Sequence, residues 1–369
     1  MKKLLFGAYS LDIGGIEKAL VILVNKLQEK GYDITLVLEK KQGIFLNEID
    51  PKIKIIEYAP SNSKNKIQRK IINLIKRIKF TLKYKNKYDF SASFATYSLP
   101  ASFIARTASK NCYLWGHADY LTLFDGNAEE MKEFFIERNY DKFKKIIFVS
   151  KEGKDSFIKV FPEMKEKTMV CNNLIDADKI LELSKEKIPE EDLSKINKLE
   201  NAQKETTIFI NVGRHQEKQK KLSRLIEAAT MLKKDDMNFK IIFVGDGPET
   251  EEYKKQVKNN QLENNIIFLG KKQNPYPYFK IADCVVLTSD YEGYPVVFLE
   301  SFILEKTIIT TKVSDYKEVE NKYGFVTEKD TKDIYEKMKN FILNGFEIKE
   351  KFDYKKYNEE ILKKIEDLF

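Results

Sequence analysis

The strongest constraint on the fold is a repeated order in which a short apolar strand is followed by a helix. This order begins at residues 3–8, pauses near residue 169, and resumes at residues 207–212. Between the two runs, residues 185–205 are highly charged and contain few apolar side chains. Strands that alternate with helices form parallel sheets covered by helices. The pattern therefore predicts two doubly wound α/β domains that face each other across a cleft.

The length agrees with this division, because 369 residues exceed one average domain and fit two of moderate size. We expect an N-terminal domain at residues 1–175, a second domain at 176–350 and a C-terminal helix at 351–369. No apolar run approaches the roughly 20 residues that span a bilayer. The three cysteines are far apart in strand-like segments, which indicates buried thiols in a reducing cytoplasm rather than disulfides or metal ligands.

One segment, residues 64–87, holds many bases and no acid. Its apolar residues recur at helical spacing and form a stripe between basic faces: Ile67, Ile71, Leu74, Ile78 and Leu82. A basic amphipathic helix of this kind is typical of binding to a membrane surface. The alternative is a surface helix that packs its stripe on the domain core. Nucleic acid is disfavoured because no nucleic-acid-binding motif accompanies the charge.

The segment 289–311 is predicted to form a βαβ unit, in which ligands meet the carboxyl end of the first strand. Glu292 lies in the turn, Pro295 suits the first helical position, and Glu300 lies inside the helix. Eight positions of helix would separate the two carboxylates by about 12 Å, whereas a retaining glycosidase needs them about 5 Å apart. The two acids therefore suit different parts of one long ligand, unless both are simply solvated.

Two further loops have residues that suit phosphate. Gly14 and Gly15 precede a helix, whose free N–H groups favour an anion. Arg214 ends a strand and is followed by Lys218 and Lys220, which offer a bidentate fork and mobile charges. The loop of Gly14 and Gly15 does not match the dinucleotide or P-loop pattern, and the later turn of Gly245 and Gly247 also stops short of the dinucleotide pattern. Tight turns therefore remain the alternative for the glycines, and a solvated basic loop remains the alternative for Arg214 and the lysines.

The chain has two histidines, and both fall in candidate loops. His117 ends a strand, where an imidazole can orient a hydroxyl or transfer a proton, although a structural role is equally open. His215 follows Arg214. Two histidines without a nearby cysteine make a zinc site very unfavourable.

Taken together, these loops resemble the family-four glycosyltransferases, which are retaining enzymes of the GT-B fold with two facing Rossmann-like domains. The resemblance rests on four segments in this order: GGIEKAL, WGHAD, GRHQEKQKKLSRLIEA and EGYPVVFLE. The last is an E-x7-E motif, and the segments VSKEGKDSF and NNLID between them also match. The similarity covers nearly the whole chain, and it implies that the C-terminal helix crosses back onto the first domain.

The resemblance implies that Arg214 and Lys220 bind the diphosphate of a nucleotide sugar and stabilise it as it leaves. One extra residue separates Arg214 from the lysine, so Lys220 is assigned by counting back from the RLIEA segment, and Lys218 remains an alternative. Negative charge grows on the diphosphate during the reaction, and preorganised cations act where charge develops.

The E-x7-E motif implies that Glu292 holds the transferred sugar together with the backbone of Gly293 and Tyr294, and that Glu300 binds the ribose hydroxyls. Tyr294 and Pro295 stand where the family often has Phe-Gly, and this change removes a backbone N–H beside the sugar. Donor preference is therefore not defined by the motif.

The resemblance also implies that Gly15 approaches the diphosphate from the first domain, and that His117 lies by the sugar and the acceptor. The expected function is retaining, metal-independent transfer of a hexose-type sugar to a growing, lipid-linked glycan, as in bacterial capsule synthesis. We expect no cofactor, a peripheral location on the inner face of the plasma membrane, and membrane contact through helix 64–87. The alternatives are an epimerase or phosphorylase-like enzyme of the same fold, or a non-catalytic partner of another transferase.

Overall fold

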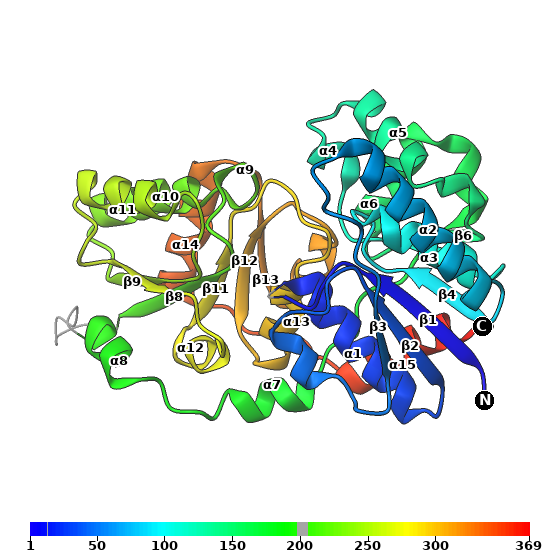
Figure 1. Ribbon diagram of the computed structural model, residues 1–369. Coiled ribbons are helices and arrows are strands. Elements are labelled where there is room, and N and C mark those ends of the chain that lie inside the picture. Colours follow the sequence, from blue (N-terminus) through cyan, green and yellow to red (C-terminus); the bar gives the residue numbers. More distant parts are fainter. Residues whose placement is uncertain (13, 198–205) are drawn as a thin grey trace. The chain divides into compact units, whose positions relative to one another are not determined.

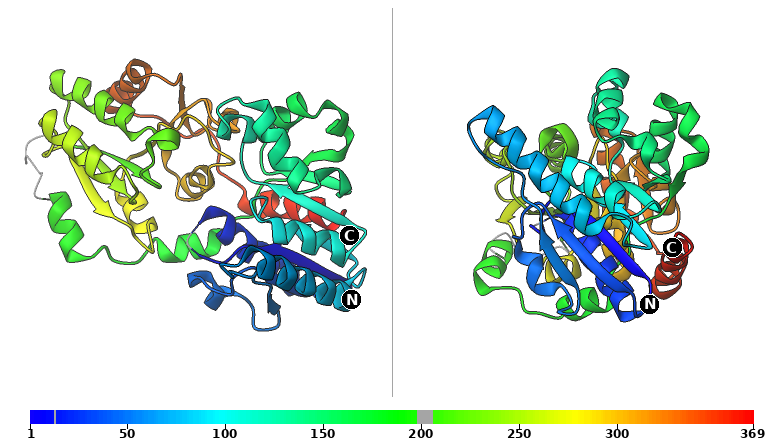
Figure 2. Two further views of the ribbon diagram at one scale, coloured as in Figure 1. Left: turned by 45° about the horizontal axis from the view of Figure 1, so that its top comes forward. Right: turned by 45° about the vertical axis from the view of Figure 1, so that its right-hand side comes forward.

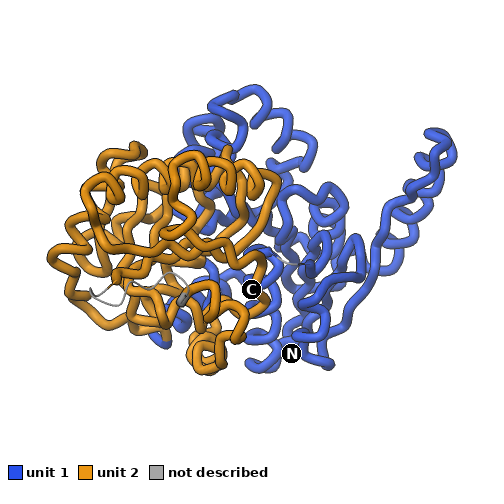
Figure 3. The backbone as a smooth tube through the Cα atoms, turned by 90° about the vertical axis from the view of Figure 1, so that its left-hand side faces the viewer, with its two compact units in different colours: residues 1–175, 355–369 blue, residues 176–354 orange. Residues whose placement is uncertain are grey.

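A computed structural model describes residues 1–12, 14–197 and 206–369 of the chain. The chain divides into two compact units, which are coloured separately in Figure 3. Unit 1 consists of Met1–Ile175 with Lys355–Phe369, and unit 2 is Asp176–Tyr354. The charged stretch expected between the domains therefore falls in unit 2, and its last residues lie outside the described part of the chain.

Unit 1 is built on a parallel sheet whose strands, among the described residues, follow the order β3-β2-β1-β4-β5-β6-β7 (Figure 1). Its strands are β1 (Lys3–Ala8), β2 (Asp33–Leu38), β3 (Lys54–Glu57), β4 (Phe90–Ser93), β5 (Cys112–Gly116), β6 (Lys145–Phe148) and β7 (Thr168–Val170). Most of their residues are buried, as expected for strands covered by helices on both faces.

The helices of unit 1 start at residues that satisfy their free N–H groups. Asn65 accepts hydrogen bonds from the first turn of α2, and Ser150 caps α6 as its sequence position predicts. The helices are α1 (Gly15–Glu29), α2 (Lys66–Tyr84), α3 (Leu99–Ala108), α4 (Tyr120–Leu123), α5 (Ala128–Glu137) and α6 (Lys151–Val160). Short 3-10 turns are η1 (Ile44–Glu48), η2 (Tyr140–Lys142) and η3 (Pro162–Lys167).

The C-terminal helix α15 (Tyr354–Glu366) packs on unit 1, which confirms the predicted return of the chain. The Leu368 carbonyl accepts hydrogen bonds from Asn111 Nδ2 at 2.7 Å and from the Tyr113 hydroxyl at 3.1 Å. The Phe369 ring meets the Phe90 ring with their centroids 4.8 Å apart. These contacts attach the chain end to the middle of the first sheet.

Unit 2 has a second parallel sheet, in the order β10-β9-β8-β11-β12-β13 among the described residues. Its strands are β8 (Thr207–Val212), β9 (Phe239–Val244), β10 (Ile266–Gly270), β11 (Cys284–Leu287), β12 (Thr307–Thr311) and β13 (Gly324–Thr327). Its helices and one 3-10 turn are α7 (Ala177–Leu183), α8 (Glu190–Asn197), α9 (Glu217–Lys220), α10 (Leu222–Lys234), α11 (Thr250–Asn259), α12 (Tyr276–Ile281), α13 (Val296–Ile303), η4 (Tyr316–Glu318) and α14 (Thr331–Asn344). Helices α10, α11 and α14 share one face of the sheet, while α7, α12 and α13 lie on the other (Figure 1).

Both sheets have the strand order of a doubly wound fold, so each has one point at which the order reverses. In unit 1 this point lies between β1 and β4, and in unit 2 it lies between β8 and β11. In open α/β sheets, ligands bind beside the carboxyl ends of the two strands at such a point. The fold therefore indicates where a ligand site is expected in each unit.

Candidate functional site

In unit 2 the predicted site residues come from two loops at the point where the strand order reverses. Strand β8 leads into the loop of Arg214 and then into α9, which ends at Lys220. Its neighbour β11, paired with β8 in parallel, leads into the turn that carries Glu292. The structure thus places side by side two loops that are more than seventy residues apart in the sequence.

The loop of Arg214 is held by close backbone packing against the end of β9. The N–H groups of Gly213 and His215 donate to carbonyls of that segment, with N···O distances of 3.0 and 3.1 Å. A Cβ atom on Gly245 would lie 1.8 Å from the Gly213 oxygen, and one on Gly247 would lie 2.1 Å from the His215 oxygen. These two glycines allow backbone to lie against backbone, so they position Arg214.

The side chain of Arg214 is exposed and has no hydrogen-bond or ion-pair partner among the described residues, whereas its carbonyl accepts from the Gln216 N–H at 3.0 Å. Lys220, by contrast, turns inward and forms an ion pair with Glu292, with its Nζ 2.6 Å from Oε1. The side chains of this pair are only 18% and 8% exposed, respectively. Lys218, the alternative lysine, is exposed on α9. The lysine that lies at the carboxyl end of β8 is therefore Lys220.

Glu292 has hydrogen bonds to both of its carboxylate oxygens. Ser289 Oγ donates to Oε1 at 2.7 Å, the same oxygen that meets Lys220, and Gln219 Nε2 donates to Oε2 at 3.3 Å. Ser289 and Gln219 were not predicted from the sequence, and both act as positioning residues for the carboxylate. Ser289 lies three residues before Glu292 in the same turn, which is the one local signal for its role.

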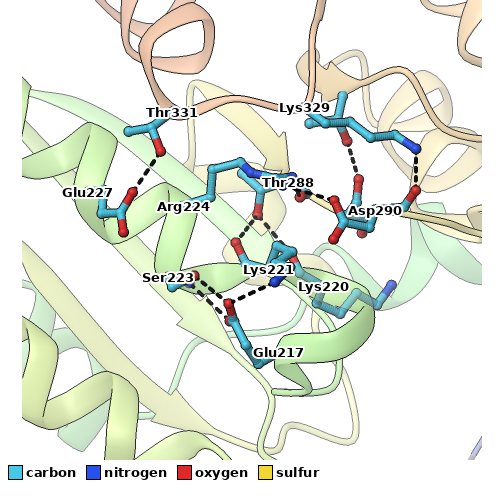
Figure 4. A network of polar contacts seen from close by, with 12 residues as sticks. Glu217, Lys220, Lys221, Ser223, Arg224, Glu227, Thr288, Asp290, Lys329 and Thr331 are labelled. Atoms are coloured by element: carbon cyan, nitrogen blue, oxygen red, sulfur yellow. Dashed lines mark hydrogen bonds and ion pairs between the residues drawn. The ribbon is translucent and has the colours of Figure 1, made fainter. Parts of the chain in front are cut away.

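A polar network joins the two loops behind the ion pair (Figure 4). Thr288 Oγ1 donates to the carbonyls of Lys220 and Lys221 at 2.9 and 3.0 Å. Arg224 of α10 pairs with Asp290 at 2.9 Å and also donates to the Thr288 carbonyl. Because these contacts connect α9 and α10 with the end of β11, they set the register between Lys220 and Glu292.

Glu300 lies inside α13, as predicted, and is buried with 7% exposure. The Tyr276 hydroxyl of α12 donates to its Oε1 at 3.0 Å. Pro295 differs from the prediction by one position, because it is the N-cap residue and α13 begins at Val296. Its extended ψ of 104° ends the polar turn before the helix.

Gly293 and Tyr294 form the remainder of this turn and are both partly buried. Ser314 Oγ donates to the Gly293 carbonyl at 2.5 Å. The turn is thereby fixed to the segment that follows β12. Its backbone is held in place beside Glu292, which is the arrangement that the predicted role of these two residues needs.

In unit 1, Gly15 is the first residue of α1, the helix that follows β1 after the connecting residues 9–14. A Cβ atom built on Gly15 meets no other atom within 4 Å. The position is therefore open, and nothing in the fold itself requires glycine there.

His117 follows β5 in unit 1, and its ring lies 4.6 Å from the Phe94 ring, centroid to centroid. Both ring nitrogens are buried and have no hydrogen-bond partner among the described residues. Burial lowers the imidazole pKa from 6.5 to about 3, so the ring is neutral near pH 7. Buried polar atoms are normally paired, so these two nitrogens are an exception among the described residues of unit 1.

Further polar side chains gather at the same edge of unit 1. The Tyr97 hydroxyl donates to Glu17 at 2.9 Å, and the Ser98 hydroxyl donates to the buried Glu39. Burial raises the pKa of the Glu39 carboxyl. These residues follow β4 and β2 or begin α1, so they surround the reversal point of the first sheet. No motif marks them, and sequence reasoning missed them.

His215 has a structural role in the described part of unit 2. Its Nδ1 lies 2.8 Å from Thr250 Oγ1, and its ring is packed among Phe243, Tyr253 and Phe268. Burial lowers its pKa. The three cysteines are free and buried, as predicted. No cluster of metal-ligating side chains occurs among the described residues.

Comparison with known proteins finds similarity to glycosyltransferases. Residues 192–359 match the family described as Glycosyl transferases group 1. An uncharacterized glycosyltransferase (MJ1059) of Methanocaldococcus jannaschii is 26% identical over 66% of this chain, which spans 58% of that relative's length. The N-acetylgalactosamine-N,N'-diacetylbacillosaminyl-diphospho-undecaprenol 4-alpha-N-acetylgalactosaminyltransferase of Campylobacter jejuni is 24% identical over 84% of this chain and 81% of its own.

The fold is shared with solved structures. The crystal structure of Anabaena Alr3699/HepE in complex with UDP superposes with a TM-score of 0.75 and 18% identity, over 99% of this chain and all of that one. These comparisons confirm both the resemblance and the fold class that the sequence predicted. Residues 192–359 match the glycosyl transferases group 1 family, and the chain as a whole has the GT-B fold.

Proposed function

We propose that the protein is a retaining glycosyltransferase that moves a hexose-type sugar from a nucleotide diphosphate sugar to a growing glycan. The observation that carries this proposal is the arrangement in unit 2 of an exposed Arg214, an inward Lys220 and a held Glu292 at one reversal point. The UDP in the Anabaena structure supports a nucleotide donor.

Each residue has a proposed part in donor binding. Arg214 and Lys220 bind the diphosphate, because a guanidinium and an ammonium at a strand end match its charge. Glu292 accepts hydrogen bonds from hydroxyls of the sugar, beside the backbone of Gly293 and Tyr294. Glu300 accepts hydrogen bonds from the ribose hydroxyls after exchanging or sharing the contact with Tyr276.

The proposed step breaks the bond between the anomeric carbon and a phosphate oxygen and forms a bond from that carbon to the acceptor oxygen on the same face. The electron pair of the broken bond stays on the diphosphate, whose oxygen takes the acceptor proton. Arg214 and Lys220 stabilise the developing charge, and one such preorganised group contributes about 3–4 kcal/mol. The step as drawn needs neither a metal ion nor a cofactor.

Two residues of unit 1 complete the proposal. His117, neutral and without a hydrogen-bond partner among the described residues, is suited to a hydroxyl of the sugar or of the acceptor. Gly15, with open space above it, lets the diphosphate approach the start of α1, where N–H groups point outward.

We also propose that the acceptor is lipid-linked and that the enzyme serves capsule or related surface-polysaccharide synthesis at the inner face of the plasma membrane. The name of the Campylobacter relative, which acts on a diphospho-undecaprenol glycan, supports this acceptor class. Among the described residues, no helix is long and apolar enough to cross a membrane.

The test is product analysis with a nucleotide sugar labelled at the anomeric carbon and lipid extract as the acceptor source. The proposal expects an extended acceptor whose anomeric configuration is that of the donor. A free epimer or a sugar phosphate would instead identify another sugar-nucleotide enzyme. Binding of the nucleotide without any product would identify a non-catalytic partner.

A further inference from the structure

Helix α2 presents two different apolar faces. The first faces unit 1, where Phe80 and Tyr84 are buried and pack with α3. The ring of Phe80 lies 5.4 Å from that of Tyr58, centroid to centroid. On the same side, Lys76 donates to the Ala59 carbonyl at 2.6 Å. These contacts anchor the helix, and they leave the remainder of its circumference outside the core.

The second apolar face is exposed to solvent. Its six aliphatic residues are Ile67 (71% exposed), Ile71 (52%), Leu74 (57%), Ile75 (46%), Ile78 (50%) and Leu82 (78%). At about 100° per residue, they fall within an arc of roughly 100° on the side opposite Phe80 and Tyr84. They account for six of the thirteen exposed large hydrophobic residues in the described chain. The stripe therefore does not pack on the core, which removes the alternative that the sequence left open.

The charge of the protein is concentrated beside this stripe. Residues 64–87 hold ten bases and no acid, and because the net charge is +8, the remaining residues together carry −2. None of these ten bases forms an ion pair with a described acidic residue. Around the helix they stand on both sides of the stripe, as Lys70 and Lys79 do. Such charges are available to an external anion.

We propose that the outward face of α2 docks on an anionic phospholipid surface, with the helix lying in the plane of that surface. The aliphatic stripe would enter the acyl boundary while the flanking bases meet the headgroup phosphates. A second copy of this chain fits less well, because pairing two stripes would bring two sets of ten unneutralised bases together. Nucleic acid offers no partner for six exposed aliphatic side chains.

The docked helix would place a defined edge of unit 1 at the membrane. Helix α2 follows β3 in the chain, and the carboxyl edge of this parallel sheet is also the edge from which β1 leads to Gly15 and β5 leads to His117. The right view of Figure 2 shows α2, in blue, running across the outside of the unit 1 sheet. This consequence rests on the proposed function, because it explains how a lipid-held acceptor would reach that edge. The docking itself does not depend on any substrate.

The test is flotation of the full chain with vesicles of phosphatidylcholine alone or of phosphatidylcholine and phosphatidylglycerol in equal parts. A charge variant replaces four exposed bases of α2 whose side chains form no hydrogen bond or ion pair among the described residues, although Lys83 lies 5.2 Å from the Tyr84 ring: Lys66→Gln, Lys70→Gln, Lys79→Gln and Lys83→Gln. A stripe variant carries Ile71→Gln, Leu74→Gln and Ile78→Gln. The matched control makes the same charge change on exposed lysines elsewhere in unit 1: Lys151→Gln, Lys159→Gln, Lys165→Gln and Lys167→Gln.

We expect flotation with the anionic vesicles only, a loss of at least about tenfold in the bound fraction for both α2 variants, and none for the control. Equal flotation of all four proteins would overturn the proposal. So would a wild-type dimer, seen by light scattering, that the stripe variant converts to monomer. Circular dichroism and calorimetry with uridine diphosphate check that the variants are folded. If the wild type does not bind uridine diphosphate, that result would count against the proposed function, but the flotation result would still stand.

Discussion

The ion pair between Lys220 and Glu292 gives a specific prediction for the variant Glu292→Gln. Both partners have proposed roles in donor binding, yet in the structure they bind each other at 2.6 Å. A diphosphate that takes Lys220 must first displace Glu292. A sugar attached to the diphosphate would then give the released carboxylate new hydrogen bonds. A nucleoside diphosphate without a sugar breaks the ion pair but offers no hydrogen bonds to the released Glu292 carboxylate.

The size of the effect follows from the burial of the pair. At 18% and 8% exposure, solvent screens it only in part, so it exceeds a surface ion pair. A charge-assisted hydrogen bond of this kind contributes about 1.5–3 kcal/mol net. Glutamine keeps the shape, and its carbonyl oxygen still accepts from Ser289. Its NH2 group cannot accept from Gln219, and the loss of charge weakens the hold on Lys220. If about half of that energy is released, affinity for the bare diphosphate rises about three- to tenfold.

Calorimetry with uridine diphosphate and with a uridine diphosphate sugar measures both sides of this prediction. Glu292→Gln should bind the bare nucleotide more tightly and lose the extra affinity that the sugar provides in the wild type. Ser223→Ala serves as a control behind the loop, since it leaves the ion pair untouched. Weaker or unchanged binding of uridine diphosphate by Glu292→Gln would refute the reasoning.

Three further predictions concern residues around the site. Gly15→Ala should leave the melting temperature unchanged, because the position is open, but should lower donor kcat/KM; an unchanged rate would remove the proposed role of Gly15. Gly247→Ala places a Cβ 2.1 Å from the His215 oxygen and should cost about 1–3 kcal/mol in urea unfolding, so unaltered stability would contradict the backbone packing described. The pKa of His117 is about 3 in the folded protein and 6.5 for an ordinary imidazole. Between these two pH values the unfolded state binds one more proton than the folded state. The free energy of unfolding therefore falls by about 1.4 kcal/mol for each pH unit as the pH drops through that range. His117→Gln should reduce this slope in urea titrations from pH 4.5 to 7.5, and an identical slope in the variant would show that His117 is not the group.

The fold was predictable because its signals are local and repeated. Strand and helix alternate with the periods of parallel α/β structure, and caps such as Ser150 stand at helix starts. The E-x7-E segment forms the predicted turn and helix, with Pro295 displaced by one position because its ψ is extended rather than helical. The order of the motifs predicts that Arg214, Lys220 and Glu292 belong to one domain, and the structure places all three in unit 2.

What the sequence did not reveal depends on contacts between distant residues. The pairing of Lys220 with Glu292 joins positions 72 residues apart. The sequence does not show that Gly245 and Gly247 pack against the Arg214 loop, a contact that the structure reveals. Periodicity identified the stripe on α2 but not its direction, because a helix can turn either apolar face to the core. Only the burial of Phe80 and Tyr84 decides that the aliphatic stripe points outward.

The central claim is that Arg214 and Lys220 hold the donor diphosphate for sugar transfer. It is tested most directly by the initial rate at which labelled sugar from a nucleotide sugar enters lipid-extractable product. The account predicts a loss of at least about tenfold in kcat/KM for Arg214→Ala and for Lys220→Ala, as expected for groups that stabilise a developing charge. Lys218→Ala, the matched control on α9, should stay near the wild-type rate. Near-wild-type transfer by Arg214→Ala and Lys220→Ala, or a loss confined to Lys218→Ala, would contradict it.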